Sequence, residues 1–114
     1  MKVHYLEIVT PEADAICAQI AAAHGATFSE PDASLGGART AALADGSLVG
    51  VRGPMHEMEH ATTRPYLLVD DIKVAFDAAV AAGAEAMVPP MEIPGRGHCA
   101  IVSQGGVESA FWQM

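Results

Sequence analysis

The segment Gly25-Ala26-Thr27-Phe28-Ser29-Glu30-Pro31 recurs in form further along the chain as Gly83-Ala84-Glu85-Ala86-Met87-Val88-Pro89. Each copy follows a helix-like segment, and each helix-like segment follows a strand-like one. Self-similarity of this kind is typical of a duplicated structural unit. The sequence therefore predicts a single domain of 114 residues, with module one at 1–53, a linker at 54–62 and module two at 63–114.

Turn and cap signals around the two copies predict the order strand, helix, strand, strand, strand in each half. Thr10-Pro11 suits the start of the first helix, since Thr can cap a helix and Pro fits its first position. Asp70 or Asp71 suits the start of the second helix, and a glycine follows each helix end. The expected strands lie at 3–10, 26–30, 39–44 and 47–52, and again at 63–69, 84–88, 98–103 and 107–113. The predicted fold class is α+β, with two tandem βαβββ modules that form a curved mixed sheet around a shared cleft.

Composition excludes some classes of partner. The net charge is −8 with only six Lys and Arg residues, whereas nucleic-acid binding needs a cationic surface. The apolar runs are far shorter than the roughly 20 residues that span a membrane, and no signal-peptide pattern follows Met1. We therefore expect a cytoplasmic protein that binds neither nucleic acid nor membrane. Cys17 and Cys99 are expected to be small buried side chains.

The pattern as a whole resembles the vicinal oxygen chelate superfamily, which includes glyoxalase I, bleomycin-resistance proteins and extradiol dioxygenases. The resemblance covers nearly the whole chain. It rests on the paired βαβββ order, on Pro-Tyr-Leu-Leu-Val-Asp-Asp at 65–71, on the Gly-Ala helix ends and on Gly-Gly-Val-Glu-Ser-Ala-Phe-Trp-Gln at 105–113. The stretch from Val88-Pro89-Pro90 to Ile93-Pro94-Gly95 is similar to a non-metal, glyoxalase-like bacterial branch. The resemblance implies a homodimer that binds a small molecule.

Metal-using members of that superfamily take one ligand from the first strand and one from the last strand of each module. These positions hold Tyr5 and Gly50 in module one, and Arg64 and Ala110 in module two. Tyr is a poor ligand for the usual divalent ions, Arg is always cationic, and Gly and Ala offer no side-chain donor. We therefore expect no metal ligands and no cofactor.

The sequence also contains a stretch that matches a second metal-binding motif. His56-Glu57-Met58-Glu59-His60 spells HExxH, the zinc-binding motif of metalloproteases. That chemistry requires both histidines on one face of a helix. Here the motif follows Gly53-Pro54 in the linker without an amphipathic pattern, so a solvated linker is expected.

Strand alternation predicts which side chains face the cleft. Glu7 is the candidate general base, because a carboxylate facing a partly closed pocket can accept a proton; the alternative is an ion pair between Glu7 and Arg64. Arg52 or Arg64 could hold a carboxylate or phosphate, or lie at the rim. The candidate ligand-binding residues are Tyr5, Leu48, Arg52, Arg64, Tyr66, His98, Glu108 and Trp112.

Two of these candidates have competing interpretations. Tyr66 and Trp112 could form a flat wall for a ring-bearing ligand, or they could be ordinary core residues. His98 follows Gly95-Arg96-Gly97, which we expect to be a loop at the cleft mouth. There it could move a proton, or it could simply be polar surface.

The functional expectation is a metal-independent, small-molecule-binding, glyoxalase-like protein. A lyase or isomerase of unknown substrate fits the superfamily's enzymatic members and the position of Glu7. The alternatives are a non-catalytic, sequestering protein of the resistance type and a regulatory subunit that binds a partner protein. The sequence leaves open whether any reaction is catalysed.

Overall fold

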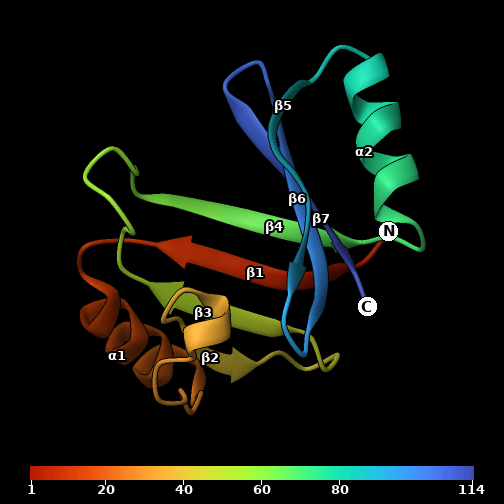
Figure 1. The fold of residues 1–114 in the computed structure, drawn as a ribbon. Helices are drawn as coiled ribbons and strands as arrows, with labels where there is room; N and C mark the ends of the chain where they lie inside the picture. The colour runs from red at the N-terminus through yellow and green to blue at the C-terminus, as the bar shows by residue number, and fades with distance from the viewer. The chain divides into compact units, whose positions relative to one another are not determined.

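A computed structural model describes residues 1–114 (Figure 1). The elements in chain order are β1 (Val3–Val9), α1 (Ala13–His24), a short 3-10 helix η1 (Ala33–Leu35), β2 (Arg39–Ala42), β3 (Leu48–Arg52), β4 (Thr62–Leu68), α2 (Ile72–Ala81), β5 (Glu85–Ile93), β6 (Gly97–Gln104) and β7 (Val107–Gln113). Two helices with strands in mixed pairing confirm the predicted α+β class. Neither helix is long and apolar enough to cross a membrane.

The chain forms two compact units. The N-terminal unit comprises Tyr5–Thr63, and the C-terminal unit comprises Met1–His4 together with Arg64–Met114. The first residues belong to the C-terminal unit because the Leu68 amide donates to the Lys2 carbonyl at 2.8 Å. The sequence had placed these residues in module one, since their tertiary hydrogen bond leaves no local signal.

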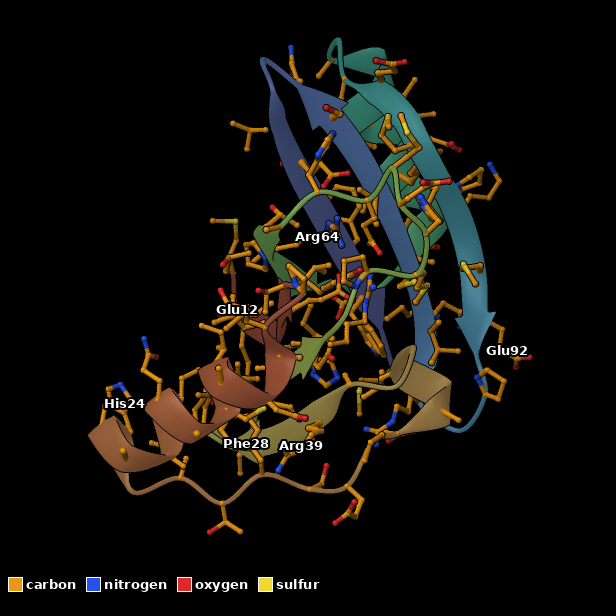
Figure 2. All side chains as sticks on the ribbon, turned by 90° about the vertical axis from the view of Figure 1, so that its left-hand side faces the viewer. Glu12, His24, Phe28, Arg39, Arg64 and Glu92 are labelled. Atoms are coloured by element: carbon orange, nitrogen blue, oxygen red, sulfur yellow. The ribbon has the colours of Figure 1, made fainter.

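In the N-terminal unit, β3 pairs in parallel with β1 and antiparallel with β2. The helix α1 lies beside these strands, and Arg39 of β2 reaches Asp14 of α1 at 3.0 Å (Figures 1 and 2). Because side chains alternate along a strand, the register puts Val49 and Val51 on the same face as Arg39. The opposite face, away from α1, carries Tyr5, Glu7, Leu48, Gly50 and Arg52.

The predicted strand at 26–30 does not form. The Ser29 amide donates to the Thr40 carbonyl, but the Thr40 amide donates to Ser29 Oγ instead of a main-chain oxygen. Three residues after Ser29, Asp32 accepts from the Ser34 amide at 2.9 Å, and the chain turns into η1. Short polar side chains that bond the nearby backbone compete with a strand ladder, so this segment stays extended without becoming a strand.

The helix boundaries show which cap predictions hold. Asp71 caps α2, since its carboxylate accepts from the Val74 amide at 3.1 Å. Gly25 ends α1 in the left-handed conformation, as predicted. The predicted start of α1 at Thr10-Pro11 is wrong, because the helix begins after Glu12. Thr10 instead accepts from the Glu12 amide at 3.1 Å, in a turn that precedes the helix.

In the C-terminal unit, β4 pairs in parallel with β7, and β7, β6 and β5 follow in antiparallel order. The helix α2 covers one face, where Ile72 and Phe76 pack against Ala100 and Val102 (Figure 1). β5 runs well past its predicted end at residue 88 and passes through Pro89 and Pro90. The register shifts after Ala86 and after Val88. Such irregularities accommodate proline on a strand that pairs along one side.

Both predicted hairpin turns are confirmed. β2 and β3 turn around Asp45-Gly46, and β6 and β7 turn around Gly105-Gly106. Gly105 and Gly106 both have positive φ, at 61° and 79°. A two-residue hairpin turn of this kind requires positive φ at both central positions, which explains the glycine pair.

Candidate functional site

Three charged side chains meet on the face of the N-terminal unit that lies away from α1. Arg52 Nε donates to Glu7 Oε2 at 2.9 Å. Its Nη1 and Nη2 atoms donate to the two oxygens of Glu59 at 2.9 and 2.7 Å. The side chains of Arg52, Glu7 and Glu59 are only 5%, 8% and 15% exposed. We call these three residues the Arg52 cluster.

The strand register explains why the cluster forms. Glu7 lies opposite Gly50 and Val9 lies opposite Arg52, so Glu7 and Arg52 are diagonal neighbours on one face of the β1–β3 pair. Arg52 is the last residue of β3, and the chain then turns into the linker that carries Glu59. The Gly53 carbonyl accepts a further bond from Nη1 at 3.1 Å. The guanidinium is therefore held on both of its edges.

Electrostatics keep Arg52 charged. The hydrogen bonds that Arg52 donates to Glu59 raise the pKa of Arg52 most strongly, burial opposes this effect, and Glu7 raises the pKa further. The cluster therefore contains one cation and two acidic side chains. Buried ion pairs of this kind are seldom the most stable way to fill a site, since apolar side chains of similar volume often do as well. A functional reason for the cluster is therefore expected.

Tyr5 and Gly50 form a second feature of the same face. A Cβ atom added at Gly50 would collide with the Tyr5 hydroxyl and lie 2.5 Å from Cζ. Gly50 has no positive φ, so glycine is needed for space and not for backbone conformation. The buried ring of Tyr5 therefore fills the place where a side chain at position 50 would stand.

The residues at the four superfamily ligand positions do not fit a divalent ion. In the N-terminal unit, the pair consists of a phenol ring packed over a glycine. In the C-terminal unit, Ala110 offers no donor, and the Arg64 guanidinium donates to Glu108 Oε1 at 2.8 and 3.1 Å. The four side chains thus offer no set of oxygen, nitrogen or sulfur ligands of the kind these ions prefer.

The HExxH motif at 56–60 lacks the helix that its zinc chemistry requires. Residues 53–61 contain neither helix nor strand, so His56 and His60 lack the shared helical face that the motif requires. Both histidines are exposed. Glu59, which the sequence placed in a solvated linker, instead reaches back to Arg52. No periodic signal announces this contact, because it depends on the path of the linker.

The C-terminal unit brings together most of its candidate residues. The register places Arg64, Tyr66, Glu108 and Trp112 on the face away from α2. The rings of Tyr66 and Trp112 meet edge to face with centroids 5.6 Å apart, and Trp112 Nε1 donates to the Arg96 carbonyl at 2.9 Å. Tyr66 and Trp112 are 6% and 3% exposed, which favours the core interpretation over an open wall.

His98 lies apart from these residues. It belongs to β6 and pairs with Gln113. Alternation puts it on the same face as Ala100 and Val102, which pack under α2. The predicted role of His98 at a cleft mouth stays a prediction. The predicted strand from His98 is confirmed, since β6 begins at Gly97, and the preceding residues 94–96 form a turn.

The outcome for the other candidates follows from these contacts. Leu48 lies opposite Tyr5 on the predicted face, as do Glu7 and Arg52. The expected pair of Glu7 with Arg64 would join residues of different units and stays a prediction. In the N-terminal unit, Arg52 forms ion pairs with Glu7 and Glu59. In the C-terminal unit, Arg64 forms an ion pair with Glu108. The roles of all these residues in binding stay predictions.

Comparison with solved structures identifies the fold, whereas comparisons by sequence identify no family. No protein-family model matches the chain, and no curated protein matches it. Among solved structures, hypothetical protein BH1468 from Bacillus halodurans C-125 aligns with a TM-score of 0.76 and 13% identity, over 99% of this chain and 94% of that chain.

Methylmalonyl-CoA epimerases also share the fold. The enzyme from Mycobacterium tuberculosis aligns with a TM-score of 0.70 and 12% identity, over 97% of this chain and 86% of that chain. A variant of the Streptomyces coelicolor enzyme in complex with 2-nitronate-propionyl-CoA aligns with a TM-score of 0.68 and 13% identity, over 99% and 96%. These epimerases belong to the vicinal oxygen chelate superfamily, so the predicted resemblance is confirmed at the level of fold.

Proposed function

We propose that this protein binds a small molecule without a metal ion, at the face of the N-terminal unit that carries the Arg52 cluster. One observation carries the proposal: a guanidinium at the end of a strand is buried together with two carboxylates. Such a cluster costs desolvation free energy that stability alone does not require. Arg fixed on one edge by a carboxylate is a preorganised group for recognising a polar ligand.

The metal-independent part of the proposal rests on the side chains at the ligand positions. The Tyr5 ring occupies the space in front of Gly50, and the Arg64 guanidinium brings a positive charge to the equivalent first-strand position. A cation at that position would repel a divalent ion. A homodimer, a cytoplasmic location and a resistance-type role stay expectations from the resemblance and the composition.

A second candidate function is catalysis by an isomerase or lyase, with Glu7 as the base. Two observations favour it: the solved structures that share the fold include epimerases, and Arg52 Nε fixes the direction of the Glu7 carboxylate at 2.9 Å. A base must be held within reach of the proton that it removes. The substrate would be a molecule with an acidic C–H bond.

Native mass spectrometry of freshly purified protein tests the binding proposal. We expect a retained organic molecule on the chain and no stoichiometric metal by elemental analysis after treatment with a chelator. One tightly held divalent ion per chain, lost in Tyr5→Phe, would contradict metal independence. Protein that retains no molecule, and whose melting temperature responds to no compound in a metabolite screen, would contradict binding.

Glu7→Gln separates the enzyme from the sequestering protein. With the molecule identified above, exchange of its acidic C–H for deuterium is followed by NMR in D₂O. An enzyme using Glu7 loses about 10²–10⁴-fold in exchange rate in Glu7→Gln while ligand affinity is largely kept. If the wild-type protein catalyses no C–H exchange, or if both proteins exchange at the same rate, the catalytic role of Glu7 is contradicted. The non-catalytic, sequestering function then remains.

A further inference from the structure

Glu59 contacts Arg52 as the carboxylate of a bound ligand would. Its two oxygens meet Nη1 and Nη2 in a two-pronged pair, at 2.9 and 2.7 Å. This geometry is the preferred recognition of a carboxylate by arginine. Glu7 holds the remaining edge through Nε, so the guanidinium keeps its orientation whichever carboxylate occupies the outer edge.

The segment that carries Glu59 has few other attachments. Every residue of 53–61 is exposed except Glu59, and the segment contains neither helix nor strand. Its internal bonds are the Glu59 amide to the His56 carbonyl at 3.1 Å and the Met55 amide to Glu59 Oε1 at 2.7 Å. The segment is thus anchored to Arg52 at two points, by the Glu59 carboxylate and by the Gly53 carbonyl, which accepts from Nη1 at 3.1 Å.

The chemistry of an exchange at Arg52 favours one class of ligand. A carboxylic acid that replaces Glu59 keeps the charge of the cluster and supplies both hydrogen-bond acceptors. A neutral molecule with a single acceptor would leave a buried guanidinium donor unsatisfied, which is unfavourable. The displaced Glu59 regains water, since the residues on both sides of it are exposed.

We propose that Glu59 is an internal stand-in for the ligand, and that the site takes a small carboxylic acid whose carboxylate displaces Glu59 from Arg52. Ligand binding then releases residues 53–61. The inference rests on the proposed function, because it names the ligand class of the same site. It also explains why Glu59, within an otherwise exposed linker, is turned inward.

Isothermal titration with propionate compares wild-type protein with Glu59→Ala. The internal competitor lowers the apparent affinity by the fraction of molecules in which Arg52 is free. We therefore expect propionate to bind at least tenfold more tightly to Glu59→Ala. Propionamide, which has the same shape and no charge, should bind neither protein. Inorganic phosphate serves as a second anion and should bind more weakly than propionate.

Glu57→Ala is the matched control, because Glu57 is an exposed carboxylate of the same segment. It should bind propionate as the wild type does. Equal affinity in Glu59→Ala and Glu57→Ala, or no saturable binding to Glu59→Ala, would overturn the proposal. If Glu59→Ala fails to fold, Glu59→Gln keeps an acceptor for the Met55 amide, and it should show the same direction of change.

The two proposals fail in different ways. An uncharged molecule retained in native mass spectrometry, together with no propionate binding to Glu59→Ala, keeps small-molecule binding and overturns the carboxylate assignment. Tight propionate binding that persists in Arg52→Gln places the ligand elsewhere and overturns both assignments of the site.

Discussion

At the scale of single residues, Tyr5 and Gly50 show how one side chain sets what another position can hold. The ring takes the space of the missing Cβ, so the two residues behave as one packing unit. Sequence alternation predicted that Tyr5 points away from the helix. It could not predict the contact with Gly50, because that contact depends on the register between β1 and β3.

Gly50→Ala tests this packing. A methyl group at position 50 meets the buried Tyr5 ring, and such overpacking typically costs about 1–3 kcal/mol of unfolding free energy. Chemical denaturation measures the loss. Gly53→Ala is the control, because Gly53 also lacks positive φ and its added Cβ would lie 4.0 Å from the Thr10 carbonyl. Equal stability of the two variants would contradict the contact.

His4 gives a prediction about pH. Burial beside Trp112, with centroids 5.5 Å apart, and the charges of Lys2 and Arg96 lower the pKa of His4. The neutral imidazole is therefore favoured in the folded state. Its contribution to stability is present above the unfolded-state pKa of about 6.5 and is lost as the pH falls below that value.

Urea unfolding of wild type and His4→Gln across this range measures the effect. The wild type should lose more stability than His4→Gln between neutral and acidic pH, and an NMR titration of the His4 ring should give a pKa below 6.5. The exposed His24 provides the control variant, His24→Gln. A His4 pKa at or above the model-peptide value would refute the burial argument.

At the scale of secondary-structure elements, most strands and both hairpins could be predicted, because alternation and glycine turns are local signals. The strand at 26–30 could not be predicted correctly, since Ser29 and Asp32 bond the backbone themselves. The length of β5 was also missed. The two prolines, Pro89 and Pro90, predicted the end of the strand. In the structure, register shifts allow the strand to continue through them.

The residue that caps the start of α2 could be identified only from the structure. The sequence left Asp70 and Asp71 as equal candidates for the cap, and the structure shows that Asp71 accepts from the Val74 amide. Asp71→Ala should therefore lower the unfolding free energy by about 0.5–2 kcal/mol. Asp70→Ala, one residue earlier, should change it less. Similar losses in both variants, measured by thermal unfolding, would contradict the assigned cap.

At the scale of the whole molecule, the sequence was sufficient for the fold class and for part of the site. The fold is shared with solved structures at only 12–13% identity, because residue patterning constrains a fold more than residue identity does. The faces of Glu7, Arg52 and Arg64 followed from alternation. The contact of Glu59 with Arg52 was missed because no periodic pattern marks the linker.

Binding at Arg52 without a metal ion is tested most directly by NMR on chelator-treated, ¹⁵N-labelled protein titrated with propionate. The side-chain Nη–H groups of Arg52 and the backbone amide of Met55 report on the contacts that change when Glu59 leaves. We predict saturable shifts of both signals with no metal added, and larger occupancy at the same propionate concentration in Glu59→Ala. Signals that stay fixed until a divalent ion is supplied would contradict the account.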